Sequence, residues 1–180
     1  MLIPTLETKR LTLRAPIATD VDAFTAFFTS DRAIHVGGPL TERVAWRTFA
    51  AEIGHWHMLG FGMWTVTMKD NDTPLGLVGG WYPADWPERE IGWLIWGEAE
   101  GRGIAFEAAT AALEYMFQTL NWPTAVSYIA PQNIRSINLA ERLGARLDKS
   151  ADYPDGKKCL VYRHSAPEMG DDDGGVEAYS

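Results

Sequence analysis

The chain has 180 residues, of which 46% are hydrophobic and 22% are charged, and its formal net charge at pH 7 is −8. This composition excludes global disorder and favours a single folded domain, which we place at residues 6–164. No apolar run reaches the roughly 18 residues that a membrane-spanning helix needs, and a single cysteine, Cys159, excludes an internal disulfide.

Acidic residues collect at the C-terminal end of the chain. Residues 165–180 contain five carboxylates and no lysine or arginine, which leaves three net negative charges on the rest. We expect this tail to be disordered and solvated. A mildly acidic body disfavours non-specific binding of nucleic acid, which requires phosphates to be neutralised. Without a secretion signal or a cysteine cluster, the sequence predicts a cytoplasmic protein with no membrane contact and no metal site.

Apolar periodicity predicts an alternation of strands and helices. In chain order we expect a strand over 6–14, a helix starting at Thr19–Asp22, a helix over 42–58, and strands over 62–69, 75–82 and 90–96. A turn at 70–72 would join the first two strands of that last group. A long helix over 103–120 follows, then a strand over 124–130, a helix over 133–143, a turn at 153–156 and a strand over 157–164. The pattern indicates an α/β fold with a mixed sheet, one parallel crossover and helices on both faces.

Two glycines, Gly101 and Gly103, lie between an expected strand and the long helix. Glycine lets successive backbone N–H groups point towards one place, and the first turn of a helix adds unpaired N–H groups and a positive dipole end. Such a segment suits a pyrophosphate. Phe106 stands where a dinucleotide-binding fingerprint needs glycine, and no P-loop sequence is present. A turn that binds nothing remains the alternative.

A second polar segment begins at Asn133, which can cap the helix that follows it. Ser136 then lies in the first turn of the same helix. Gly144 suits the left-handed position at its end. From these residues alone, a capped amphipathic helix without a ligand is the favoured interpretation.

Together these segments resemble the GNAT superfamily of N-acetyltransferases, and in particular its RimJ/RimL-like branch. The opening over 6–14 resembles the start of that branch, and Arg102–Ala105 with Glu107–Ala108 resembles the pyrophosphate loop of the family. Asn133-x-x-Ser136, followed by Glu141–Gly144, resembles the helix beside the pantetheine arm of coenzyme A. The resemblance covers residues 6–164.

The resemblance implies a sheet that splays between 90–96 and 124–130 and takes acetyl-CoA as co-substrate. The implied cofactor-binding residues are Leu94, Ile95 and Trp96 on the pantetheine amides, Arg102, Gly103, Ile104 and Ala105 on the pyrophosphate, and Asn133 and Ser136 beside the thioester. Two positions depart from the family pattern. Glu100 stands where glutamine or arginine is usual, and we expect its side chain to face solvent. Ala140 replaces the tyrosine that many members use as an acid, so Ser136 would stabilise the thiolate that leaves.

The resemblance implies an enzyme that moves the acetyl group to a primary amine by direct attack in a ternary complex. Glu90 is the expected base, either through burial among tryptophans or through water, although it could instead pair with an arginine; Glu88 is a weaker candidate. Trp81 and Trp86 could wall the acceptor pocket or only pack. Arg135 and Arg142 could be solvated or could reach the 3′-phosphate.

Several questions stay open from the sequence. The acceptor could be a protein N-terminus or a small amine, and the protein could be a monomer or a homodimer. Two other functions remain: an acyl-CoA-binding module without turnover, and a structural protein whose glycine turn binds nothing.

Overall fold

The computed structural model describes residues 2–154 and 158–166, so most of the acidic tail and part of the expected turn at 153–156 lie outside it. The helices are η1 (Ala18–Asp20), α1 (Val21–Phe28), η2 (Asp31–His35), α2 (Glu42–Leu59), η3 (Gly97–Ala99), α3 (Ile104–Glu114), η4 (Tyr115–Thr119) and α4 (Ile134–Arg142). The strands are β1 (Leu6–Glu7), β2 (Leu11–Arg14), β3 (Met63–Met68), β4 (Asn71–Trp81), β5 (Glu90–Ile95), β6 (Thr124–Ile129), β7 (Arg146–Leu147) and β8 (Leu160–Ser165). No helix in the described part of the chain has the length and apolarity to cross a membrane.

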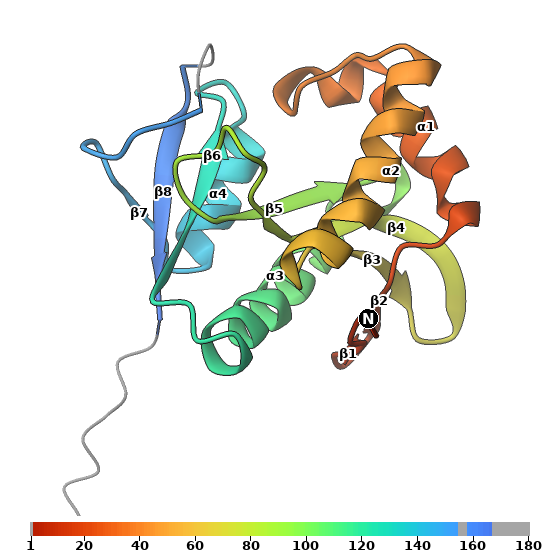
Figure 1. The fold of residues 1–180 in the computed structure, drawn as a ribbon, viewed down its shortest axis with the longest axis horizontal. Helices are drawn as coiled ribbons and strands as arrows, with labels where there is room; N and C mark the ends of the chain where they lie inside the picture. The colour runs from red at the N-terminus through yellow and green to blue at the C-terminus, as the bar shows by residue number, and fades with distance from the viewer. Residues whose placement is uncertain (1, 155–157, 167–180) are drawn as a thin grey trace, which may run out of the picture.

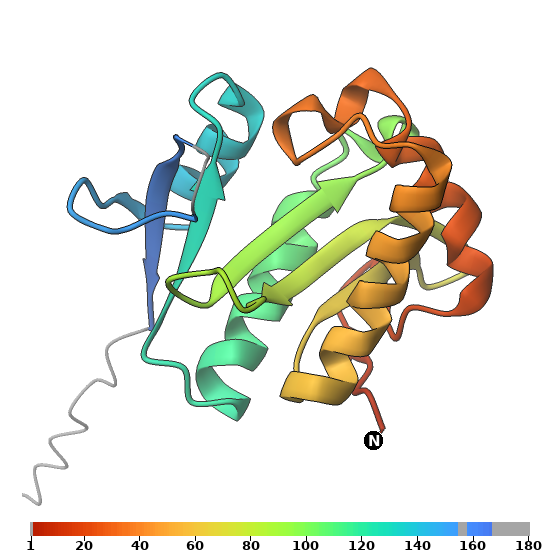
Figure 2. The ribbon, with the colours of Figure 1, turned by 45° about the horizontal axis from the view of Figure 1, so that its top comes forward.

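The described strands form one mixed sheet in the order β1-β2-β3-β4-β5-β6-β8-β7. Neighbouring strands run antiparallel except β5 and β6, which are parallel because α3 carries the chain across between them. This confirms the predicted mixed sheet with one crossover. Figures 1 and 2 show α1 and α2 over one face of the sheet and α3 and α4 over the other.

The sheet splays between β5 and β6, as the resemblance implies. Among the described residues the two strands share one register pair, Glu90 with Val126, and the Val126 N–H donates to the Arg89 carbonyl at 3.0 Å. Beyond this pair the strands separate towards Ile95 and Ile129, and Figure 2 shows the resulting V. Within the described sheet, the V leaves the β6-facing edge of β5 without a strand partner.

Alternation along β3 shows how the sheet divides the core. Trp64 and Val66 belong to the apolar cluster with α3, whereas Met63 packs with Phe49 of α2 on the opposite face. Both clusters are closely packed and apolar, so the two helical layers fix the position of β5 from both sides. The sheet is therefore a rigid support for whatever lies at the mouth of the V.

The start of α1 is held by a buried charge pair rather than by the expected cap at Thr19. The Asp20 carboxylate accepts from both Nη atoms of Arg14 at 2.8 and 2.9 Å, from Thr65 Oγ1 at 2.8 Å and from the Ile17 N–H at 3.0 Å. The Arg14 guanidinium and these hydrogen bonds hold the pKa of Asp20 below its ordinary value against the opposing effect of burial. Asp20 therefore ties α1 to β2 and β3.

Several boundaries differ from the sequence expectation. The strand expected over 6–14 is a hairpin, because Thr8 Oγ1 accepts the Leu11 N–H and turns the chain between β1 and β2. The turn before β4 ends at Asp70, so that strand starts at Asn71 rather than Leu75. The helix expected over 103–120 is α-helical only to Glu114 and then widens into a π turn. The last strand starts at Leu160, and the short strand β7 was not predicted.

Candidate active site

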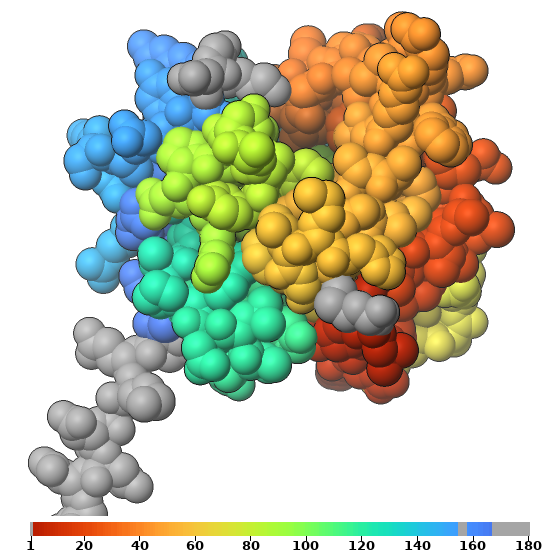
Figure 3. Space-filling model, in the orientation of Figure 1, coloured from red at the N-terminus to blue at the C-terminus, as the bar shows by residue number. Residues whose placement is uncertain are grey.

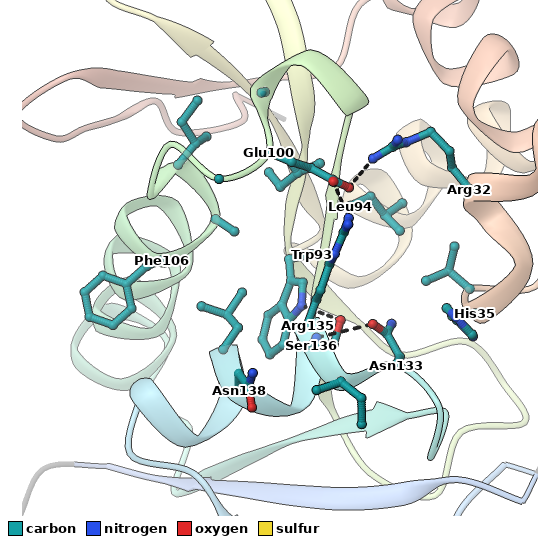
Figure 4. A pocket seen from close by; sticks show the side chains of 18 of the residues that line it. Arg32, His35, Trp93, Leu94, Glu100, Phe106, Asn133, Arg135, Ser136 and Asn138 are labelled. Carbon is teal, nitrogen blue, oxygen red and sulfur yellow. Dashed lines mark hydrogen bonds and ion pairs between the residues drawn. The ribbon is translucent and has the colours of Figure 1, made fainter.

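A cavity of about 1020 Å³ opens where β5 and β6 separate. Most of its lining comes from η2, the end of β5, the loop before α3, the start of α3 and α4, as Figure 4 shows in close-up. The lining residues on which the argument depends are Arg32, Trp93, Leu94, Ile95, Glu100, Gly103, Ile104, Ala105, Asn133, Arg135 and Ser136. The cavity is large and mixed in polarity, which suits an extended ligand with charged and apolar parts.

The glycine loop forms one wall of this cavity. Gly101 and Gly103 have φ values of +71° and +75°, a left-handed conformation that strains other residues. Gly103 directly precedes α3, so the unpaired N–H groups of the first helical turn begin at Ile104. The loop therefore presents backbone donors and the positive end of a helix dipole to the cavity, an arrangement that suits a phosphate.

The loop is anchored from behind by the β1–β2 hairpin. Glu107, in the first turn of α3, accepts from Thr8 Oγ1 at 2.6 Å, from the Arg10 N–H at 2.9 Å and from Arg10 Nε at 2.7 Å. Arg10 also donates to the Arg102 carbonyl at 3.1 Å. Through these bonds Glu107 fixes the start of α3, and with it the glycine loop, against the β1–β2 hairpin.

Most of the residues predicted to bind the cofactor meet at this cavity. Leu94, Ile95, Gly103, Ile104, Ala105, Asn133 and Ser136 all line it. Arg102 and Trp96 are not among the lining residues. The Trp96 N–H donates to the Leu75 carbonyl at 2.8 Å, which corrects the expectation that it faces the ligand. Because backbone groups alternate along a strand, Ile95 directs its own N–H and C=O to the open side.

Glu100 is half-buried and lines the cavity, whereas the sequence expectation had its side chain facing solvent. Its carboxylate bridges Arg32 of η2 and Arg135 of α4, and Figure 4 shows it between the two guanidinium groups inside the cavity. Two cations thus compensate the acid in a loop suited to phosphate. Arg135 is paired rather than merely solvated, while Arg142 lies 4.7 Å from the centre of the Phe106 ring.

Ser136 is oriented by the two residues nearest to it. Its Oγ accepts a hydrogen bond from Trp93 Nε1 at 3.1 Å, and its N–H donates to Asn133 Oδ1 at 3.3 Å (Figure 4). Asn133 therefore caps α4 as predicted. Because the Ser136 oxygen accepts from Trp93, its own proton is directed towards a different partner.

Glu90 lies at the vertex of the V and is not part of the cavity lining. Its Oε2 accepts from Trp86 Nε1 at 2.6 Å. Glu88 is held differently: both of its carboxylate oxygens accept from Arg163, which lowers its pKa. Paired in this way, Glu88 is a structural group and a poor base.

Glu52 was not predicted, yet it is the most perturbed carboxyl on this face of the sheet. It lies on α2 with only 5% of its surface exposed, and its Oε2 has no hydrogen-bond partner in the described part of the chain. Burial, reinforced by the negative charge of Glu90, raises the pKa of Glu52 to about 8. The burial of Glu52 and its raised pKa could not be predicted from its place in an amphipathic helix, because only the fold brings Glu52 near Glu90.

Comparison with known proteins is consistent across most of the chain. Residues 10–146 match the acetyltransferase (GNAT) domain family. An acetyltransferase of solved structure from Agrobacterium tumefaciens strain C58 is 40% identical, with a TM-score of 0.86, over 91% of this chain and 95% of that one. The family match includes all the residues that line the cavity.

Two other relatives are more distant. The uncharacterized N-acetyltransferase YnaD of Bacillus subtilis is 31% identical over 81 residues, which is 45% of this chain and about half (48%) of that relative. RimL, a ribosomal L7/L12 alpha-N-protein acetyltransferase solved in complex with coenzyme A, superposes with a TM-score of 0.69 over 90% of this chain and 98% of its own. At 18% identity the RimL likeness shows the shared fold.

Proposed function

The chain belongs to the GNAT acetyltransferase family, and from that premise we propose that it transfers the acetyl group of acetyl-CoA to a primary amine by direct attack in a ternary complex. One observation carries the proposal. The left-handed Gly103 and the open first turn of α3 form a wall of a cavity that Ile95 and Ser136 also line. The residues expected to bind the diphosphate and the thioester therefore line one cavity.

The residues of the cavity divide between the parts of acetyl-CoA. The N–H groups of Gly103, Ile104 and Ala105 would bind the diphosphate. The pantetheine arm would run along the free edge of β5, with the Ile95 N–H and C=O as its strand-like partners. Arg32 and Arg135 lie close enough to the loop to bind a phosphate once it competes with Glu100.

The chemistry requires positioning more than it requires a strong acid or base. An unprotonated amine attacks the thioester carbonyl, the carbon–sulfur bond breaks, and the electron pair remains on sulfur. Holding both substrates in one cavity supplies much of the rate enhancement. The Trp93 N–H, which by alternation lies on the same open side of β5 as that of Ile95, would stabilise the carbonyl oxygen as it gains charge, and the Ser136 O–H would donate to the departing sulfur.

Glu90 is the proposed acceptor of the amine proton. It lies four residues before Leu94, roughly 13 Å along the strand at about 3.3 Å per residue, so its carboxylate does not reach the thioester and would take the proton from the amine, either directly or through water. Trp86 fixes that carboxylate through a hydrogen bond of 2.6 Å and so keeps it at the vertex of the V.

The acceptor belongs to one of two classes: the N-terminus of a protein or a small primary amine. The first class is supported by the fold shared with RimL, which is a ribosomal L7/L12 alpha-N-protein acetyltransferase. Family and fold leave the acceptor open, because the same fold serves many substrates.

The test is an acceptor screen that measures release of the coenzyme A thiol and the mass of the product. The panel should contain peptides with free N-termini and small primary amines. We expect stoichiometric thiol and acetylated amine with at least one acceptor. Stabilisation by acetyl-CoA with no thiol release on any acceptor would instead show a binding module. No stabilisation by millimolar acetyl-CoA would reject both.

A further inference from the structure

The structure holds a second carboxyl beside Glu90 that the proposed chemistry does not use. Glu52 continues the buried stripe of α2, one turn after Phe49. Phe49 packs against the same face of the sheet as Met63 and Leu94. The side chain of Glu52 is thus directed at the face of the sheet from which Glu90 rises, and the charge of Glu90 acts on it.

The position of the Glu90 carboxylate follows from its neighbours. A Cβ built on Gly92 would lie 3.9 Å from Glu90 Oε1 and 3.7 Å from Met63 Cε. Glu90 and Gly92 point to the same face because side chains alternate along β5. The carboxylate therefore folds along the strand to a place above Gly92, towards the cavity and not away from it.

Gly92 lies between this carboxyl pair and the cavity. A Cβ at this position would make ordinary van der Waals contacts with Met63 Cε and Glu90 Oε1, so only a small group fits above Gly92 beside these two side chains. The next residue on the same face, Leu94, lines the cavity and lies roughly 7 Å further along the strand. A small group above Gly92 would touch the carboxyl pair on one side and approach the thioester on the other.

We propose that Glu52 and Glu90 form the ammonium-binding site for the acceptor, which is therefore a primary amine that arrives as a cation. This inference rests on the proposed acetyl transfer. The Oε2 of Glu52 is the feature that points to a ligand, because a buried carboxyl oxygen without a partner among the described residues is costly and a donor placed beside it would lower that cost. An ammonium supplies three donors and one positive charge to the two carboxyls.

Trp86 and Tyr128 give the site an aromatic rim. Trp86 donates to Glu90, and the rings of Trp86 and Tyr128 meet edge to face with centroids 6.3 Å apart. Figure 3 shows the connection between β4 and β5, which carries Trp86, at the surface beside α2. An ammonium next to tryptophan and tyrosine gains a further attraction to the ring faces. The rim therefore favours a cation over a neutral group of the same size.

The charged groups around Glu52 make its ionisation depend on the ligand. His55, in the next turn of α2, is neutral: its Nδ1 donates to the Phe61 carbonyl at 2.8 Å and its Nε2 accepts the Tyr82 N–H at 2.9 Å. On β3 the nearby side chain is the apolar Met63, and on β6 the phenol of Tyr128 also feels the charge of Glu90. Among the described residues, Glu90 is thus the charged partner of Glu52. The positive charge of a bound cation would offset the negative charge of Glu90, lower the pKa of Glu52 and so release its proton.

The test measures amine binding without turnover. The protein is saturated with coenzyme A, which carries no acetyl group, and titrated calorimetrically near pH 7 with n-butylamine, phenethylamine, spermidine and a hexapeptide with a free N-terminus. Running each titration in two buffers of different ionisation enthalpy counts the protons released. We expect at least one amine to bind the wild-type protein with release of about one proton, and the corresponding alcohol or acetylated peptide not to bind.

Glu52→Gln is the discriminating variant, with Glu42→Gln at the exposed start of α2 as the matched control. We expect the Glu52→Gln substitution to keep the packing, to weaken amine binding roughly tenfold to a hundredfold and to abolish proton release. Glu42→Gln should match wild type. Equal affinity and equal proton release in wild type and Glu52→Gln would overturn the inference, as would failure of every amine to bind.

The same samples separate this inference from the proposed function. Acetyl transfer by wild type together with unchanged amine binding in Glu52→Gln would leave the function intact and reject the role of Glu52. Amine binding that depends on Glu52, without acetyl transfer to any amine, would reject the function and support the site.

Discussion

The indole nitrogen of Trp93 lies 3.1 Å from Ser136 Oγ and donates a hydrogen bond to it. The bond joins the strand on one side of the V to the helix on the other, across the entrance that the pantetheine would use. The Ser136 oxygen accepts this bond, so its own proton is available to another acceptor. In the proposed function Trp93 would position Ser136, and Ser136 would be the group that touches the sulfur.

Replacing Ser136 should therefore slow the reaction without preventing coenzyme binding. We expect Ser136→Ala to lower kcat by roughly 10- to 100-fold, because one hydrogen bond to a developing charge is lost, and to change the Kd for acetyl-CoA less than about threefold. Trp93→Phe should give a smaller loss of kcat. Steady-state kinetics and calorimetry measure both quantities, and an unchanged kcat in Ser136→Ala would remove the serine from the chemistry.

A carboxylate in the glycine loop should abolish coenzyme binding. Gly103→Glu places a negative side chain at the proposed diphosphate site, and Gly103→Ala adds only a methyl group there. Gly60→Glu is a matched control, since Gly60 ends α2 with a similar φ of +79° and an open surround. We expect a loss of more than about 100-fold in affinity for acetyl-CoA in Gly103→Glu alone, measured by calorimetry. Equal affinities in Gly103→Glu and Gly60→Glu would show that the diphosphate binds away from Gly103.

Glu100 should oppose coenzyme binding, because it occupies two arginines that a phosphate would use. Glu100→Gln keeps the size of the side chain and frees Arg32 and Arg135. We expect acetyl-CoA to bind roughly 3- to 10-fold more tightly, with a steeper dependence on salt. Glu114→Gln, the same change of charge at the exposed end of α3 and outside the cavity lining, should have little effect. Weaker binding in Glu100→Gln would mean that the acid positions the arginines instead.

The buried Glu52 should make stability depend on pH. The unfolded chain ionises this carboxyl near pH 4.5, whereas the folded protein keeps it protonated up to about pH 8. The folded state holds the extra proton in that window, so the free energy of unfolding falls as pH rises from about 5 to 8. We expect Glu52→Gln to gain stability on wild type across this window, by an amount on the order of a few kcal/mol. Urea denaturation at pH 5 and pH 8 measures it, and parallel curves for the two proteins would show that Glu52 is not buried as a neutral group.

Asp20 should make the free energy of unfolding depend on pH in the opposite direction to Glu52, and at lower pH. Its lowered pKa means that its contribution is complete above its ordinary pKa and is lost as pH falls through the lower value in the folded protein. Asp20→Ala leaves the Thr65 hydroxyl and half of the Arg14 guanidinium unpaired in the interior. We expect a loss of about 3 kcal/mol at pH 7, measured by urea denaturation. A loss below about 1 kcal/mol would show that Arg14 is satisfied by Asp72 alone.

The fold could be predicted wherever the apolar pattern had one interpretation. The crossover through α3 follows from a strand, a glycine loop and an amphipathic helix in sequence, and the structure has it. The hairpin at Thr8 could not be predicted, because one side-chain hydrogen bond turns a segment that alternates throughout. The π turn after Glu114 likewise arises from packing at the end of the helix rather than from local preference.

The backbone geometry of the site could be predicted from the sequence, whereas the partners of its charged side chains could not. Gly103 and Asn133 each serve a local geometry that a short sequence specifies, a left-handed turn and a helix cap. Glu100 was misjudged because its partners, Arg32 and Arg135, are 68 and 35 residues away in the chain. Glu52 was missed for the same reason, since only the packing of α2 on the sheet places it opposite Glu90.

The most direct test of the account is a crystal structure of the protein in complex with coenzyme A. We expect the diphosphate oxygens within hydrogen-bond distance of the N–H groups of Gly103, Ile104 and Ala105, and the thiol sulfur beside the Ser136 hydroxyl. A complex in which the nucleotide lies away from the start of α3, with that turn filled by side chains, would contradict the account.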